Sequence, residues 1–123
     1  MVNAFIQERE LFPPAIPFRS GFLQRDKHEI YHEQCGNIDG QSLLFLHGGP
    51  GAEIAPAHRR LFDPKRFHVV LFDQRGCGQS RPHASLDDNQ TDALIGDIEA
   101  LRKSMNIDNC LLYTSPSPRD KHR

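Results

Sequence analysis

The sequence has no long hydrophobic run and no excess of charge of either sign. A membrane-spanning helix needs about 20 consecutive apolar residues, so we expect no transmembrane segment. The 15 basic and 16 acidic residues are mixed along the chain and give a formal net charge of −1, which argues against a nucleic-acid partner. Residues 1–10 contain charged side chains and no apolar core, which argues against a secretory signal peptide and favours a cytoplasmic location.

Cysteine is scarce, and its three copies form no paired motif. Cys35, Cys77 and Cys110 are widely spaced and odd in number, so they predict free thiols in a reducing compartment rather than a disulfide framework. The seven histidines include no cluster with the spacing of metal ligands. We therefore predict neither a metal site nor a cofactor.

Hydrophobic patterning divides the chain into a leader, a core domain and a tail. Residues 1–18 carry three prolines and predict an irregular leader, residues 19–112 contain the apolar runs of a partial core domain, and residues 113–123 are a Pro/Ser-rich tail that we expect to be disordered. The elements expected in the core are a hairpin of residues 21–24 and 30–35, a strand at 43–46, a short helix at 57–62, a strand at 69–72, a helix at 91–105 and a strand that begins at Cys110. Apolar strands that alternate with helical segments predict an α/β fold with a parallel sheet.

The first candidate site is a glycine-rich turn directly after the strand at 43–46. It consists of His47, Gly48, Gly49, Pro50 and Gly51. Two adjacent glycines let the backbone direct its N–H groups outward, because no Cβ blocks a close approach. In acyl-transfer enzymes such N–H groups bind the oxyanion of the tetrahedral intermediate. A plain strand-to-helix turn is the alternative, but the full five-residue string after a buried strand favours an oxyanion hole.

A second glycine-rich turn follows the strand at 69–72. Its shaping residues are Asp73, Gln74, Arg75, Gly76, Gly78 and Ser80. The dinucleotide-binding pattern G-x-G-x-x-G fails at Arg81, and no Gly-Lys-Ser/Thr of a phosphate-binding loop is present. We interpret the turn as structural, with Asp73 paired to Arg75 and Ser80 capping the next segment of the chain. Cys77 has no base near it in the sequence and is expected to be a packed thiol rather than a nucleophile.

Together the two turns resemble those of the proline iminopeptidases, a family of the α/β-hydrolase superfamily. The similarity lies in Gly-Gly-Pro-Gly at 48–51, in Leu-Phe-Asp-Gln-Arg-Gly-Cys-Gly-Gln-Ser at 71–80 and in Arg-Pro-His at 81–83, and it extends over about residues 10–110. The Asp-x-Arg-Gly-x-Gly-x-Ser part occurs across the superfamily, whereas the Gln and Cys within it and the Arg-Pro-His continuation are typical of this family. The resemblance implies the amino-terminal part of an α/β-hydrolase sheet, with an edge hairpin, parallel strands and flanking helices.

The resemblance also implies a metal-free serine peptidase that removes N-terminal proline from peptides. In such enzymes a serine on a G-x-S-x-G elbow attacks the carbonyl, a histidine activates the serine and an aspartate orients the histidine. One oxyanion N–H maps onto Gly49 or its neighbour Gly48. A helical lid carries acidic residues that hold the free amine of the substrate, so peptides with an N-terminal proline are the substrates expected for the full-length protein.

The sequence departs from the family where the nucleophile elbow should stand. The strand that begins at Cys110 leads into Tyr-Thr-Ser-Pro-Ser at 113–117, where neither Ser115 nor Ser117 has a glycine two residues away on either side. Pro116 fixes φ and lacks an N–H group at the place where the elbow needs one. We therefore expect a chain without a catalytic triad, an incomplete sheet and an inactive fragment, whose unusual end reflects an assembly artefact or a broken gene model rather than a real tail.

Two other interpretations stay open at this point. One is the start of another α/β-hydrolase, of the esterase or epoxide hydrolase type, against which residues 74–83 argue. The other is a non-catalytic α/β-hydrolase-like chain that works with a partner. In every case the strand at Cys110 would form an apolar sheet edge, which is a template for aggregation. We expect the chain alone to be insoluble or only partly folded.

Overall fold

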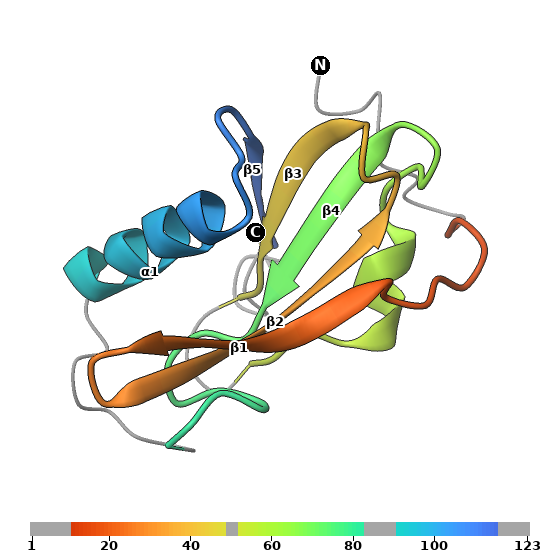
Figure 1. Ribbon diagram of the computed structural model, residues 1–123. Coiled ribbons are helices and arrows are strands. Elements are labelled where there is room, and N and C mark those ends of the chain that lie inside the picture. Colours follow the sequence, from red (N-terminus) through yellow and green to blue (C-terminus); the bar gives the residue numbers. More distant parts are fainter. Residues whose placement is uncertain (1–10, 49–51, 83–90, 116–123) are drawn as a thin grey trace, which may run out of the picture.

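The computed structural model describes residues 11–48, 52–82 and 91–115, which form one sheet with a helix on each face (Figure 1). The elements are β1 (Arg19–Arg25), β2 (His28–Gly36), β3 (Gln41–Leu46), the 3-10 helix η2 (Pro56–Arg60), β4 (Phe67–Phe72), α1 (Thr91–Ser104) and β5 (Leu111–Thr114). The predicted series of hairpin, strand, short helix, strand, helix and strand is confirmed.

The five strands lie in the order β1-β2-β4-β3-β5. β2 pairs antiparallel with both β1 and β4, whereas β3 pairs parallel with both β4 and β5. The predicted α/β fold, with an edge hairpin and parallel strands, is therefore confirmed. The register of β3 and β4 runs from Gln41↔Phe67 to Leu46↔Phe72. Because these two parallel strands end at the same edge, the loops that follow them leave the sheet side by side.

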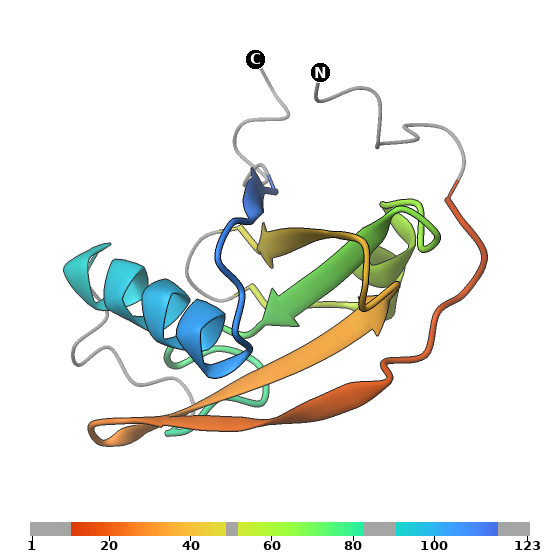
Figure 2. The ribbon, with the colours of Figure 1, turned by 45° about the horizontal axis from the view of Figure 1, so that its top comes forward.

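Both faces of the central strands β3 and β4 are covered, which explains why their apolar residues run without alternation. α1 covers one face and η2 covers the opposite one (Figure 2). The side chains between the sheet and α1 are Ile30, Leu44, Val70, Phe72, Leu94, Ile98, Leu101 and Met105. Those on the η2 face are Cys35, Leu43, Phe45, Phe62, Phe67, Val69 and Leu71. All four apolar positions that predicted the helix at 91–105 thus face the sheet.

One tight contact fixes how β2 ends beside the start of β4. Gly36, the last residue of β2, has a φ of 87°, in the left-handed region that favours glycine. A Cβ atom at this position would lie 2.3 Å from the backbone oxygen of Phe67. Asn37 then donates its N–H to that same oxygen over 2.9 Å, so the chain turns away while it stays bonded to β4.

The structure describes only part of the predicted leader and of the predicted tail. Residues 11–18 form no helix or strand, and residues 1–10, the larger part of the predicted leader, lie outside the described residues. β5 extends through Thr114, and the N–H of Ser115 donates to the C=O of Leu46 over 2.9 Å. Residues 113 and 114, which were predicted to begin a disordered tail, therefore belong to β5. Backbone pairing does not require apolar side chains. Residues 116–123 lie outside the described residues.

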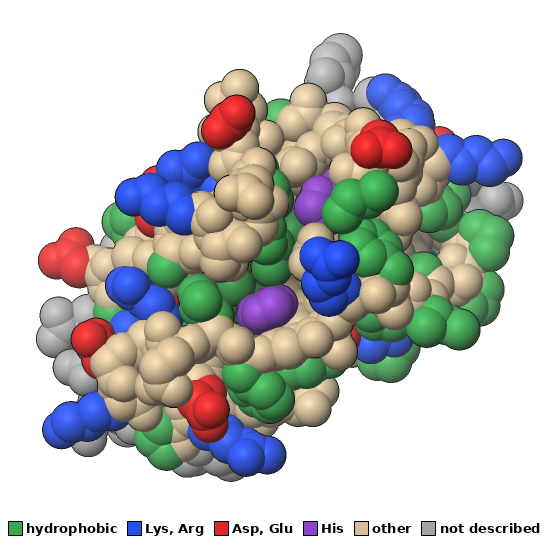
Figure 3. Space-filling model, in the orientation of Figure 1, with side chains coloured by type: hydrophobic (Ala, Val, Ile, Leu, Met, Phe, Trp, Pro, Cys, Tyr) green, Lys and Arg blue, Asp and Glu red, His purple; other side chains and the backbone are tan. Residues whose placement is uncertain are grey.

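The surface of the described residues carries charges of both signs. Lysine and arginine side chains are interspersed with aspartate and glutamate side chains on the face drawn in Figure 3. None of the helices in the described part of the chain combines the length and the apolar composition that a bilayer crossing needs.

Candidate functional site

The two glycine-rich turns start from neighbouring positions at one edge of the sheet. His47 follows β3 and Asp73 follows β4, directly after the paired residues Leu46 and Phe72. In open α/β sheets, ligands bind at the edge formed by the carboxyl ends of the parallel strands. Sequence reasoning treated the turns as two motifs, and the structure joins them into one site.

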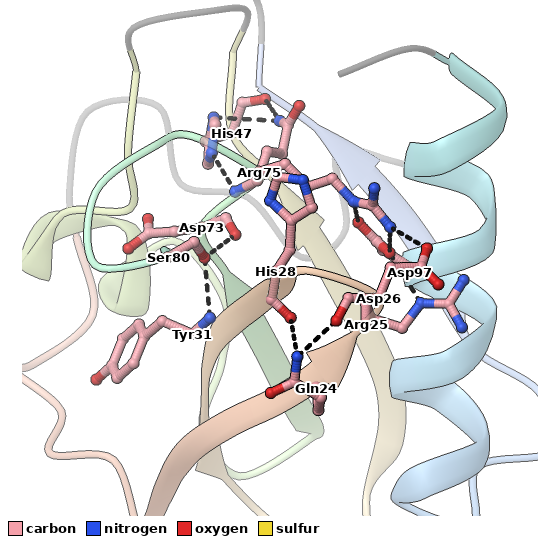
Figure 4. A network of polar contacts seen from close by, with 11 residues as sticks. Gln24, Arg25, Asp26, His28, Tyr31, His47, Asp73, Arg75, Ser80 and Asp97 are labelled. Atoms are coloured by element: carbon pink, nitrogen blue, oxygen red, sulfur yellow. Dashed lines mark hydrogen bonds and ion pairs between the residues drawn. The ribbon is translucent and has the colours of Figure 1, made fainter. Parts of the chain in front are cut away.

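His47 links the first turn to the second (Figure 4). Its side chain is buried, and its Nε2 atom accepts the backbone N–H of Gln74 over 3.0 Å. The ring proton therefore lies on Nδ1, which donates to the C=O of Gly48 over 2.6 Å. The side-chain amide of Gln74 donates in return to the C=O of His47 over 2.9 Å. The base of the first turn is thus fixed to the second turn by bonds in both directions.

The electrostatics of His47 suit this holding role. Burial lowers the pKa of its imidazole, although the bond to Gly48 and the nearby Asp73 oppose the shift. A neutral ring is also what the bond from Gln74 requires, because a protonated Nε2 could not accept an N–H. His47 therefore supports the backbone of the turn.

The carboxylate of Asp73 binds backbone from the second turn and from the segment that follows the first turn. Its Oδ1 atom accepts the N–H of Ile54 over 2.8 Å, and its Oδ2 atom accepts the N–H of Gln79 over 2.9 Å. Burial raises the pKa of this carboxyl, and these two N–H groups oppose the shift. Gly78 has a φ of 49°, and a Cβ there would lie 2.3 Å from Oδ2. Glycine at 78 thus lets the second turn wrap closely around the carboxylate.

Ser80 ties the second turn back to the sheet. Its hydroxyl donates to the C=O of Asp73 over 2.6 Å and accepts the N–H of Tyr31 in β2 over 2.9 Å. Arg81 then exchanges two backbone hydrogen bonds of 2.9 Å with Glu29. The hydroxyl thus spans the turn and a strand, whereas most of the next segment, which Ser80 was expected to cap, lies outside the described residues.

Arg75 connects the second turn to α1 (Figure 4). Its guanidinium binds Asp97 through two bonds, Nε to Oδ2 over 2.8 Å and Nη2 to Oδ1 over 3.0 Å. Arg25 of the hairpin binds the same carboxylate over 3.0 Å. The expected pairing of Arg75 with Asp73 is therefore wrong, because the carboxylate of Asp73 faces the backbone of the two turns while Arg75 extends toward α1.

The chain that follows the first turn is also anchored. Ala55 donates its N–H to Nδ1 of His58 over 2.9 Å, which closes the start of η2. Arg59 at the other end of η2 binds the buried Glu33 of β2 through both carboxylate oxygens, with Nη2 to Oε2 at 3.0 Å. These contacts, together with the bond from Ile54 to Asp73, fix the backbone beyond residues 49–51.

The structure describes some of the predicted site residues and leaves others undescribed. Gly48 is described and partly exposed, and it follows the anchored His47 directly. Gly49, Pro50 and Gly51 lie outside the described residues. Gly76 adopts a positive φ of 76°, as Gly78 does, which suits the predicted role of both glycines in shaping the turn.

Sequence reasoning missed three residues that hold the site, Asp97, His58 and Glu33. Asp97 carried a usable signal, because it lies four residues before Leu101 at the margin of the apolar stripe of α1, where a charge is buried only when paired. Glu33 stands between His32 and Gln34 in β2, so its immediate neighbours gave no signal that it would be buried. His58 carried none, since its role depends on the fold of η2. Within 11–48, 52–82 and 91–115, no three His, Cys, Asp or Glu side chains group as metal ligands would.

Comparison with known sequences finds relatives that match most of this chain. The sequence model of the alpha/beta hydrolase fold family matches residues 41–113. A proline iminopeptidase of Arabidopsis thaliana is 48% identical over 112 residues, which are 90% of this chain and 30% of the plant protein. A probable proline iminopeptidase of Leptolyngbya boryana is 47% identical over 106 residues, 85% of this chain and 33% of its own length. The chain thus spans about a third of the length of these curated relatives.

Solved structures give the same fold. A proline iminopeptidase-related protein of Thermus thermophilus superposes with a TM-score of 0.66 and 30% identity, over 78% of this chain and 35% of its own. An epoxide hydrolase of Vigna radiata superposes with a TM-score of 0.59 and 23% identity, over 80% of this chain and 32% of its own. At 23% identity, the similarity to the epoxide hydrolase shows a shared fold and nothing more.

Proposed function

The chain belongs to the α/β-hydrolase fold family, and from this membership we propose that it is the oxyanion-hole side of a serine aminopeptidase that releases N-terminal proline from peptides. Its curated relatives support the peptidase assignment, since those named above are proline iminopeptidases or probable ones at 47–48% identity. The resemblance found in the sequence is thereby confirmed. The substrate and the serine chemistry are our proposal.

The observation that carries the proposal is the bond network at the base of the first turn. His47 is held by Gln74 on one side, and Ile54 is held by Asp73 on the other. An oxyanion hole works because its N–H groups are held in place before charge develops on the substrate oxygen. In the sequence, the proposed donors Gly48 and Gly49 fall between His47 and Ile54. Loss of one such donor costs about 3 kcal/mol of transition-state stabilisation.

We further propose that catalysis needs groups beyond this chain. A serine peptidase requires a nucleophile, a general base and an orienting acid. The buried residues of the site that could be mistaken for such groups are engaged with backbone, since His47 binds Gln74 and Gly48, and Ser80 binds Asp73 and Tyr31. The 123-residue chain alone should therefore release no proline. The three free cysteines support a reducing, cytoplasmic location.

A chimeric enzyme tests this function. The matched residues of this chain replace the corresponding part of the full-length Arabidopsis relative, which is 48% identical over 112 residues. We expect the chimera to release proline from a proline arylamide and to be inhibited by serine-directed reagents. The control is the same chimera with the elbow serine changed to alanine, which should be folded and inactive.

The substrate panel separates the alternatives. Alanine arylamide, a simple ester and an epoxide are assayed beside the proline arylamide. Preference for the ester or the epoxide in a chimera with native-like circular dichroism would contradict the peptidase proposal. A folded chimera with no activity on any substrate would contradict the claim that this segment supplies a working oxyanion hole.

A further inference from the structure

Gln74 of the second turn binds His47 of the first turn through two separate groups. Its backbone N–H donates to Nε2 of the His47 ring over 3.0 Å, and its side-chain amide donates to the C=O of His47 over 2.9 Å. The first bond is available to any residue at position 74 except proline, which has no backbone N–H. The second bond needs a side chain that is long enough and ends in an N–H group, so it depends on the identity of this residue.

The side-chain bond fixes the orientation of one peptide group. The C=O of His47 and the N–H of Gly48 belong to the same planar, trans peptide group, in which they point in opposite directions. Because the C=O is held on the side of Gln74, the N–H of Gly48 points away from the second turn. Glycine has the least restricted backbone of all residues, so an external contact has to set this orientation.

His47 transmits the contact to the next peptide group. Its Nδ1 atom donates to the C=O of Gly48 over 2.6 Å, so the ring holds the carbonyl that follows. The backbone N–H of Gln74 keeps the ring in this position, because it occupies the Nε2 atom. Gln74 therefore holds two successive C=O groups of the first turn, one directly and one through His47.

The backbone around Gln74 is itself fixed. The C=O of Gln74 accepts the N–H of Cys77 over 2.9 Å, which closes the second turn. The preceding residue, Asp73, donates its N–H to the C=O of Tyr31 in β2 over 3.0 Å. The side-chain amide of Gln74 thus extends from a position that the sheet and the second turn determine.

We propose that Gln74 is a positioning residue of the oxyanion hole, whose side-chain amide holds the His47–Gly48 peptide group so that the N–H groups of the first turn stay directed at the substrate oxygen. This inference rests on the proposed function, because it assigns a role within the same site. An oxyanion hole stabilises charge that develops only in the transition state. A misdirected N–H group should therefore lower kcat more than it raises KM.

Variants of the chimera described above, assayed with a proline arylamide, test this role. Gln74→Met keeps the approximate length of the side chain and removes its N–H group, while the backbone bond to His47 can still form. Gln74→Glu has the same shape, but its carboxylate cannot donate to the C=O of His47. It would also compete for the Nδ1 proton, since the side-chain nitrogen of Gln74 lies 3.2 Å from Nδ1. The matched control is Gln41→Met, which changes an exposed glutamine at the start of β3, the end remote from the site.

We expect both Gln74 variants to lower kcat by about 10- to 100-fold with KM changed by less than about threefold, because complete loss of an oxyanion donor costs about 10²–10³-fold in kcat. Gln41→Met should have the kinetics of the unchanged chimera. The proposal is overturned if both Gln74 variants keep kcat within about twofold, if their loss appears only as a raised KM, or if Gln41→Met loses as much. Far-UV circular dichroism verifies that all the proteins are folded.

Crystal structures of the chimera and of its Gln74→Met variant separate this inference from the proposed function. A folded but inactive unchanged chimera would contradict the proposed function, and the orientation of the His47–Gly48 peptide group would still decide the role of Gln74. We expect the C=O of His47 to point toward residue 74 in the unchanged chimera and to turn away, or to lose defined electron density, in the variant. The same orientation in both structures would contradict a positioning role.

Discussion

Replacing Asp97 with alanine tests whether a buried ion network holds α1 against the second turn. The carboxylate of Asp97 binds Arg75 and Arg25, over 2.8 and 3.0 Å for the closest atoms. The side chain of Arg75 is 5% exposed, whereas that of Arg25 is 33% exposed. The substitution therefore leaves the buried Arg75 with a longer contact of 3.8 Å to the exposed Asp26, whereas Arg25 can reach water.

The magnitude follows from this difference in burial. Removing one partner of a buried ion pair costs about 3–5 kcal/mol, because the remaining charge stays desolvated. The share of Arg25 is small, since solvent screens its charge. The free energy of unfolding of a whole domain is about 5–15 kcal/mol. With a urea m value of about 2 kcal/mol per M, we expect Asp97→Ala to lower the unfolding midpoint by about 2 M.

Urea denaturation followed by far-UV circular dichroism measures this loss. The control is Asp92→Asn, an exposed aspartate on the same helix, which should change the free energy of unfolding by less than about 0.5 kcal/mol. A double variant, Arg75→Met with Asp97→Leu, removes both buried charges and should lose less stability than Asp97→Ala.

Two results would refute this reasoning. The first is a loss of less than about 1 kcal/mol for Asp97→Ala, which would mean that the network carries little net stabilisation. The second is a double variant that is less stable than Asp97→Ala. In that case the cost would come from lost packing rather than from a buried charge.

Two further predictions use the same assay. Gly78→Ala should destabilise the chain by about 1–3 kcal/mol, since its φ is positive and its Cβ would overlap the carboxylate of Asp73, whereas Gly21→Ala, with 3.7 Å to its nearest atom, should be tolerated; equal losses would contradict the steric argument. Acid should also destabilise the chain, because burial lowers the pKa of four histidines below the 6.5 of the unfolded chain. They are His32, His47, His58 and His68. The unfolded state then binds more protons below pH 6.5, so their stabilisation is present above pH 6.5 and is lost as pH falls through it. The raised pKa of Asp73 opposes this loss, because the folded chain then binds a proton more readily than the unfolded chain does. This effect begins at lower pH than that of the histidines and is complete near 3.8, the ordinary pKa of the carboxyl. A urea midpoint that is the same at about pH 7.5 and pH 5.5 would contradict this prediction.

The elements of the fold were predictable because each has a local pattern. The spacing of Leu94, Ile98 and Leu101 defines one helix face, and that face packs on the sheet. The uninterrupted apolar residues of β3 and β4 predict strands buried on both faces, and both are central strands. Such patterns depend only on residues close in sequence.

The partners of the polar side chains were not predictable in the same way. Arg75 and Asp73 are two residues apart, which made them a natural pair, but the partner of Arg75 is Asp97, 22 residues further on. That contact depends on where α1 lies over the sheet, and no local pattern contains this information. The length of β5 is a similar case, because pairing with β3 determines where the strand ends.

The residues that hold the proposed oxyanion turn differ from the proposed N–H donors, Gly48 and Gly49. The turn is held at His47 by Gln74, at Ile54 by Asp73 and further along at Arg59. All of these contacts are made within the described residues of this chain, so none needs the part of the relatives that this chain does not match. Preorganised N–H donors contribute to catalysis only if the backbone that carries them is already fixed. The described contacts would therefore hold the proposed oxyanion turn in place, and His47 and Asp73 contribute both to these contacts and to the stability of the chain.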